Sequence, residues 1–359
     1  MKKIIEALNI GWTIALKDVR DAFSNKGTRT NILVLVGLVI FFYWMSTLRP
    51  FDKRVDVVLL EQGASNQQFE RAKLADGSEL TFRMADSFPE LEQKLAYQDL
   101  GILIPENFDQ LVASGGEVRL TGYLHWAKRG QVSELENRYS TMFSELLGTP
   151  VRVEIGANIL KPLVNAQGNA ATAAFHVFFA IFWMALSVVP FLIIEERQTK
   201  TMEALLVSPA SPGLVVFGKA IASLILVTAI AGLSIALNSI YIINWGWAIT
   251  GFLVTAVFAI GLGLLLGSII RSSQQVTLWM LPVAFLFVVP GFLADEPNLT
   301  QAVKSIFNWL PGVAFNRILG FSVSSGADTS MILFNLAIAV TSIFVVYALV
   351  IWQIRRSDR

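Results

Sequence analysis

The sequence ATAAFHVFFAIFWMALSVVPFLII at residues 171–194 is followed directly by EERQTKTMEALLVSPASP at residues 195–212. The first stretch is long enough to cross the hydrocarbon core of a bilayer, which takes about 20 apolar residues in a helix. The second stretch is charged and amphipathic, and another apolar run follows it at residues 214–238. Two membrane spans usually need only a tight turn between them. The longer segment therefore predicts a docking element for another protein.

Apolar runs of this length recur along the chain. The predicted spans are residues 32–48, 171–194, 214–238, 245–270, 276–293 and 331–354. The composition agrees, since 54% of the 359 residues are hydrophobic, 15% are charged and the mean hydropathy is +0.58. We therefore expect an α-helical membrane protein with six transmembrane helices. We expect the first span to be retained, because it lacks the short apolar core and small-residue cleavage site of a signal peptide.

Lys and Arg residues concentrate on one side of the predicted spans. On that side fall Lys2, Lys3, Lys17, Arg20, Lys26, Arg29, Arg197, Lys200, Lys219, Arg271, Arg355, Arg356 and Arg359. The short loops on the other side offer Lys304 and Arg317. Because cytoplasmic loops carry the excess of basic residues, we expect a multi-pass inner-membrane or plasma-membrane protein. Both termini and residues 195–212 are expected in the cytoplasm.

The spans divide the chain into four parts. Residues 1–30 are predicted to hold an interfacial helix, because apolar and charged residues mix over residues 10–23. Residues 31–49 contain the first span, residues 50–170 form a polar domain on the outer side, and residues 171–359 carry the other five spans. At residues 290–320 we expect a re-entrant outer element, with Pro290 breaking the fifth span and Pro311 ending a short amphipathic piece.

The polar domain alternates short β patterns with helical ones. Predicted strands are residues 55–60, 80–84, 100–104, 118–124 and 151–155, and predicted helices are residues 88–97, 107–113 and 132–147. This alternation is typical of a small mixed α/β domain. The chain has no cysteine, so its core must hold by packing rather than by disulfides.

The charged segment resembles the coupling segment of ABC exporter permeases of the second type. That pattern runs roughly Glu-x-x-x-Gly-Thr-Leu-Glu-x-Leu-Leu-x-x-Pro, followed by Gly-Lys. Matching residues are Thr201, Glu203, Leu205, Leu206, Pro209 and the pair Gly218 and Lys219. Lys200 replaces the Gly of the pattern, and Met202 replaces its Leu. The six-span plan and the excursion after the fifth span fit the same family.

This resemblance implies the membrane subunit of an ATP-driven exporter, not an enzyme. Two permease chains, identical or different, would pair above two separate ATPase subunits that hold ATP and Mg, and the large outer domain offers a surface for a periplasmic partner. The expected ATPase-docking residues are Glu195, Glu196, Arg197, Thr201, Met202, Glu203, Leu205, Leu206, Ser208 and Pro209. No catalytic, metal or cofactor site is expected in this chain, and its net charge of +1 does not favour nucleic acid.

Residues 213–220, GLVVFGKA, have the Gly-x4-Gly-Lys spacing of a phosphate-binding loop. Such a loop follows a strand and continues with Ser or Thr, whereas Pro212 precedes this one and Ala220 ends it. We therefore reject a nucleotide site here. Lys219 is instead expected to extend to the membrane boundary.

Two functions of other classes also agree with parts of the sequence. One is an ion-coupled transporter, which needs titratable groups near the bilayer midplane. No predicted span carries Asp, Glu or Arg in its middle third, and His176, near the outer end of the second span, is expected to be a hydrogen-bonding residue. The other is a membrane-anchored sensor or assembly platform with a ligand-binding outer domain. A neighbouring gene for a lone ATPase would favour the exporter over both.

Overall fold

The computed structural model describes residues 2–24, 26–47, 54–63, 69, 71–75, 77–164, 168–198, 212–270, 272–296 and 298–357. The chain forms two compact units. The helical unit comprises residues 1–45, 173–322 and 327–359, and the α/β unit comprises residues 46–172 and 323–326.

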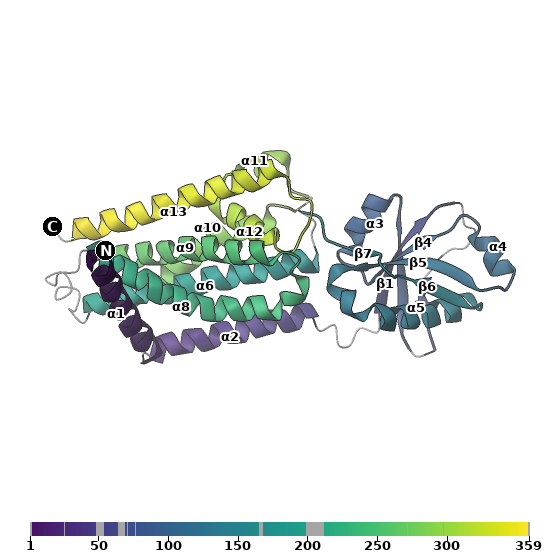
Figure 1. The fold of residues 1–359 in the computed structure, drawn as a ribbon, viewed down its shortest axis with the longest axis horizontal. Helices are drawn as coiled ribbons and strands as arrows, with labels where there is room; N and C mark the ends of the chain where they lie inside the picture. Colours follow the sequence, from purple (N-terminus) through teal and green to yellow (C-terminus); the bar gives the residue numbers. More distant parts are fainter. Residues whose placement is uncertain are drawn as a thin grey trace. The chain divides into compact units, whose positions relative to one another are not determined.

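The helical unit is built from long apolar helices with two short ones between the last two (Figure 1). Its helices are α1 (Lys2–Ser24), α2 (Lys26–Thr47), α6 (Asn169–Gln198), α8 (Pro212–Leu237), α9 (Trp245–Ile269), α10 (Ser273–Leu293), α11 (Gln301–Phe307), α12 (Pro311–Gly320) and α13 (Thr329–Ser357). A short 3₁₀ turn, η2 (Ser239–Tyr241), follows α8. In Figure 1 both chain ends lie at the end of this unit where α6 finishes and α8 begins.

In the described part of the chain, six helices are long and apolar enough to cross a membrane. Their spans are residues 26–44, 169–194, 216–237, 245–269, 274–293 and 329–353. These bounds lie within a few residues of the predicted ones, except that the first begins earlier. The prediction of six helices that are long and apolar enough to span a membrane is therefore confirmed.

Helix α6 is the centre of the helical unit. In its span 83% of the residues are buried, against 17% for α2, 28% for α10 and 22% for α13. Two glycines let α9 approach α6 closely. A Cβ added at Gly263 would lie 2.6 Å from the Ala185 carbonyl oxygen, and one added at Gly267 would lie 2.6 Å from the Pro190 carbonyl oxygen. The small-residue spacing on α9 therefore brings two helices of the same chain together.

The segment after α10 departs from prediction at two prolines. Pro290 lies inside α10, which continues to Leu293, so it does not break the helix. Membrane helices tolerate such prolines because neighbouring groups satisfy the freed backbone. Pro311 was expected to end a helical piece and instead begins α12. At the first helical position its missing N–H costs nothing, because that donor has no partner within the helix.

The α/β unit contains one mixed sheet. Its strands are β1 (Arg54–Glu61), β2 (Ala72–Lys73), β3 (Glu79–Ala85), β4 (Leu100–Ile104), β5 (Val118–His125), β6 (Val151–Glu154) and β7 (Ile159–Leu160). The order is β2-β3-β1-β4-β5-β6, with β7 paired to β5. β1 is parallel to both β3 and β4, whereas β4 and β5 are antiparallel. The mixed α/β prediction is confirmed, and only the two-residue strands β2 and β7 had no sequence signal.

Helices cover this sheet from both sides. Helix α5 (Val132–Leu147) contributes Leu135, Tyr139, Met142 and Phe143 to the main core, where they pack with the inward residues of the strands. It ends at Gly148, whose φ of 64° is the left-handed conformation that glycine adopts readily. Helix α3 (Phe88–Leu95) packs Leu91 against Val58 and Ala85 on the opposite face, and α4 (Phe108–Ala113) buries Phe108 in the main core.

Residues 323–326, between α12 and α13, belong to the α/β unit. The Ser325 amide donates to the Pro162 carbonyl at 2.8 Å, and the Val164 amide donates to the Ser325 carbonyl at 3.1 Å. The chain therefore enters this unit twice, once through residues 46–172 and once through this short excursion.

Candidate functional site

The predicted docking segment lies between the end of α6 and the start of α8. Glu195, Glu196 and Arg197 lie in the last turns of α6, which ends at Gln198. The other predicted docking residues, Thr201, Met202, Glu203, Leu205, Leu206, Ser208 and Pro209, lie outside the described residues. The structure therefore defines the two helices that flank this segment and the helix that packs on them.

Helix α1 packs closely along the first turns of α8. A Cβ added at Gly218 would lie 2.9 Å from both the Gly11 carbonyl oxygen and the Ile14 Cβ, and one at Gly11 would lie 3.0 Å from the Phe217 ring. Ile14, Ala15 and Ala22 are buried on the same side of α1. Glycine on both helices thus permits their close approach.

A buried ion pair joins α1, α6 and α8. The Lys219 ammonium lies 3.2 Å from the Asp18 carboxylate and donates a hydrogen bond to the Leu192 carbonyl at 2.8 Å. The exposed fractions of the two side chains are 2% and 5%. A buried charge of this kind needs a partner of opposite sign. Asp18 meets that need from α1, and the carbonyl supplies a second acceptor from α6.

The prediction for Lys219 was wrong in one respect. The side chain does not extend to the membrane boundary, because α1 covers this part of α8 and brings a carboxylate to it. The spacing of residues 213–219 resembles a phosphate-binding loop, but these residues lie in α8. A phosphate-binding loop wraps its backbone amides around the phosphates before its helix begins, whereas the amides of residues 216–219 lie past the first turn of α8 and are committed to helical hydrogen bonds.

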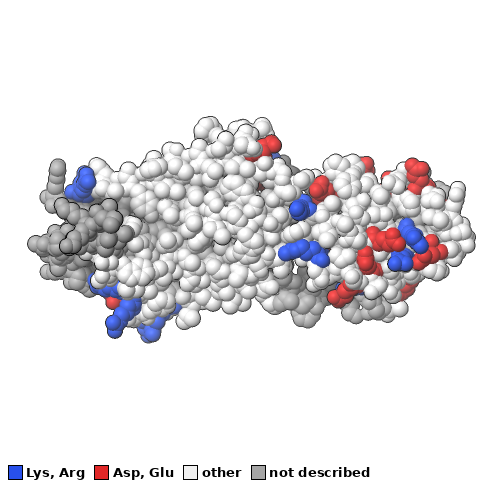
Figure 2. Space-filling view, viewed as in Figure 1, with Lys and Arg blue, Asp and Glu red and all other residues white. Residues whose placement is uncertain are grey.

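Exposed apolar side chains on α1 lie at the same end of the helical unit as exposed basic side chains of α1, α2 and α13. Trp12, Leu16 and Phe23 are exposed apolar side chains. Lys17, Arg20, Lys26, Arg29, Arg355 and Arg356 are exposed at the same end of the unit. Figure 2 shows Lys and Arg at that end, next to a wide surface free of charged side chains. An amphipathic helix with this surface fits a membrane–water boundary.

A second polar cluster lies at the other end of the helical unit. Arg317 on α12 donates to Asp295 and to Asn308, each at 2.8 Å. Asn316 donates to the Gly291 carbonyl at 2.8 Å. These contacts hold α12 to the end of α10 and to the turn after α11. The sequence located Arg317 only as an outer loop charge, since nothing in its spacing to Asp295 and Asn308 indicates that the three meet.

His176 on α6 stacks on Phe42 of α2, with ring centroids 5.4 Å apart. Its Nδ1 is buried and has no hydrogen-bond partner among the described residues, so the expected hydrogen bond does not form at this nitrogen. Within the ranges that the structure describes, no three His, Asp or Glu side chains gather as metal ligands.

A family model described as ABC-2 family transporter protein matches residues 28–352. The chain belongs to this family. It is also 22% identical over 374 residues to the inner membrane transport permease YhhJ of Escherichia coli (strain K12), and the same holds for that of Shigella flexneri. Each alignment covers 92% of this chain and 92% of the relative. The resemblance predicted from residues 195–212 is thereby confirmed. As an ABC-2 family transporter protein, the chain is a multi-pass membrane protein that takes part in transport. The ion pair of Asp18 and Lys219 lies between the last turns of α6 and the first turns of α8.

Proposed function

We propose that this chain is the permease subunit of an ATP-driven exporter in which two permease chains pair and two separate ATPase subunits supply the energy. The place of Lys219 carries this proposal. Its ammonium is held inside the helical unit by Asp18 and Leu192. The one phosphate-loop spacing singled out in the sequence therefore offers its lysine to Asp18 rather than to a nucleotide, which supports an energy source in another chain. Membership of the ABC-2 family supports the same conclusion.

The ATPase docks on residues 195–212 in this proposal. Met202, Leu205 and Leu206 are the apolar anchors, and Glu203 is a charged contact at the rim. Because α1, α6 and α8 are joined by the Lys219 contacts, a displacement of the segment would move the bases of all three helices together. The coupling thus reaches α6, the helix with the most buried span.

The docking test replaces Leu205 and Leu206 together by Asp and measures how much co-expressed ATPase co-purifies with the chain. Burying two Leu side chains is worth roughly 3 to 6 kcal/mol before the costs of binding, so the double variant should lose the ATPase. The matched control replaces both residues by Met, which keeps an apolar surface of similar volume. Undiminished co-purification of the Asp variant would exclude this docking mode.

The exposed basic side chains at the end with the chain termini support one membrane orientation. We place that end in the cytoplasm and the α/β unit outside, because cytoplasmic loops carry the excess of Lys and Arg. Reporter fusions at Gly63, Ser208 and Asp358 test this topology. A cytoplasmic signal at Gly63 would reverse it.

A further inference from the structure

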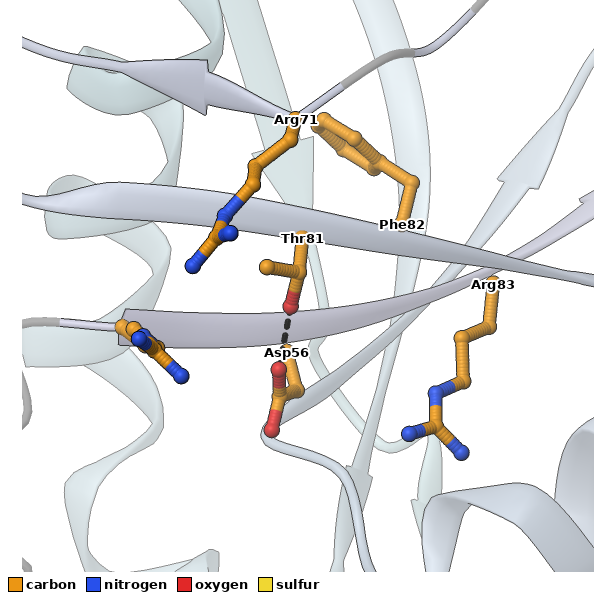
Figure 3. A pocket seen from close by; sticks show the side chains of 6 residues that line it. Asp56, Arg71, Thr81, Phe82 and Arg83 are labelled. Atoms are coloured by element: carbon orange, nitrogen blue, oxygen red, sulfur yellow. Dashed lines mark hydrogen bonds between the residues drawn. The ribbon is translucent and has the colours of Figure 1, made fainter.

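A groove with a volume of 490 Å³ lies on the sheet of the α/β unit. Its lining residues are Arg54, Asp56, Arg71, Thr81, Phe82 and Arg83. They come from β1, β3 and the residue before β2. Figure 3 shows Arg71 and Arg83 on opposite sides of a hydrogen bond between Thr81 and Asp56. The volume lies within the range of about 300–1,000 Å³ that small-molecule sites occupy.

The strand register places the charged residues on one face. Across the parallel pair of β1 and β3, Asp56 lies opposite Thr81, Arg54 opposite Glu79, and Val58 opposite Arg83. Helix α3 covers part of this face, where Leu91 packs on Val58 and Ala85. The rest of the charged face remains open as the groove.

Glu79 holds two of the arginines in place. Arg71 binds both oxygens of the Glu79 carboxylate, one of them at 2.8 Å, and the Arg54 Nε lies 3.2 Å from one of the same oxygens. Burial by itself raises the pKa of Glu79, but the Arg71 hydrogen bond and the charges of Arg71, Arg54 and Lys73 outweigh it and hold this pKa below its ordinary value. Glu79 therefore stays ionised and keeps both guanidinium groups oriented.

Arg83 differs from these two arginines. Its side chain is exposed, and among the described residues it has no hydrogen-bond or ion-pair partner. The lining residues carry three arginines and one carboxylate, a net charge of +2, and the neighbouring Glu79 lowers the sum to +1. The groove is thus prepared for an anion, and the open guanidinium offers it planar N–H donors.

We propose that this groove binds a phosphate ester, with Arg83 as the main contact of the phosphate and Asp56 facing the rest of the ligand. Guanidinium groups favour phosphate because their donors match its oxygens. The Asp56 carboxylate repels a second anion and favours a ligand amine or hydroxyl, so an ethanolamine phosphate fits better than inorganic phosphate. A lipid headgroup and a soluble ester share this chemistry. The proposal does not depend on the docking of an ATPase.

The test measures binding by calorimetry to the full chain in dodecyl maltoside, a detergent without phosphate. The probes are inorganic phosphate, phosphoethanolamine and a short-chain phosphatidylethanolamine below its micelle concentration. We expect phosphoethanolamine to bind more tightly than phosphate. Stronger binding of the short-chain lipid would identify a lipid headgroup as the ligand, and equal binding a soluble ester.

The variants separate the groove from general charge effects. Arg83→Ala should weaken phosphoethanolamine binding at least about tenfold, and Arg83→Lys should recover part of it, since lysine supplies charge without the planar fork. The control is Arg138→Ala, which removes another exposed arginine, from α5 on the opposite face of the sheet. Its affinity should stay within about twofold. No binding by the native chain at millimolar phosphoethanolamine, or equal losses in Arg83→Ala and Arg138→Ala, would overturn the proposal.

Discussion

The buried pair of Asp18 and Lys219 leads to a quantitative prediction about the helical unit. The two charged groups are 3.2 Å apart, and their side chains are 5% and 2% exposed. At an effective dielectric constant of about 20, unit charges at this distance attract by roughly 5 kcal/mol. Part of that energy offsets desolvation. Removing one partner of a buried pair costs about 3–5 kcal/mol, because the other charge is left without compensation.

Asp18→Asn leaves the Leu192 carbonyl bound to the ammonium, so its cost should lie near the lower end of that range. Lys219→Met removes the charge and the hydrogen bonds to Asp18 and Leu192, and it leaves the buried Asp18 carboxylate without this ammonium. The double variant removes both charges and keeps similar side-chain volumes. It should therefore be less destabilised than the sum of the single variants, by about 2–3 kcal/mol.

The assay is equilibrium unfolding in mixed micelles of SDS and dodecyl maltoside, followed by far-UV circular dichroism. Lys17→Met serves as the control, since it removes an exposed charge from the same helix and should change the free energy of unfolding by no more than about 0.5 kcal/mol. If the two single effects simply add in the double variant, Asp18 and Lys219 do not act as a pair and the reasoning fails.

Three further predictions concern other parts of the chain. Gly267→Ala should destabilise the helical unit by about 1–3 kcal/mol in the same unfolding assay, because its Cβ would press on the Pro190 backbone, whereas Gly232→Ala has open space and should be neutral or stabilising. The α/β unit should lose stability as the pH falls from 6.5 toward 4: burial, and secondarily the charge of Lys128, lowers the pKa of His125 from 6.5 to about 4, so the unfolded state binds the extra proton in this window. His125→Asn, which keeps an acceptor for the Ala127 amide, should remove this pH dependence of hydrogen-exchange protection in the unit, and an unchanged profile would contradict the assignment. The purified chain alone should not hydrolyse ATP; turnover that is lost in Lys219→Ala would reveal a nucleotide site that the helical geometry argues against.

Much of the fold was predictable because its signals are local. The length of an apolar run is enough to predict a membrane span. The strands of the α/β unit are predicted by alternation of inward and outward residues, as in Val118–His125, where Val118, Leu120 and Leu124 point into the core. The two-residue strands were too short to carry a period. The prediction at Pro311 was wrong because proline can begin a helix as well as end one, and here it begins α12.

The site contacts were harder to predict, because they join residues far apart in the sequence. Asp18 and Lys219 are separated by 201 positions, and Asn316 reaches a backbone carbonyl 25 positions away. The amphipathic pattern of α1 predicted a helix at a boundary, but the pattern does not distinguish which of its polar residues turns inward. The pair of Gly218 and Lys219 carried some signal. Gly218 lets α1 approach α8 closely, and this approach brings the Asp18 carboxylate to the Lys219 ammonium.

The short excursion of residues 323–326 has a mechanical consequence. Because Ser325 is hydrogen-bonded to Pro162 and Val164, a pull along α12 or α13 is transmitted to the sheet unit through the backbone itself. The chain also connects the same unit to α2 at residue 46 and to α6 at residue 172. The chain therefore connects this unit to the helices at several points rather than at one. Replacing Ser325 by Pro would remove the amide that donates to Pro162 and loosen this attachment without removing any strand.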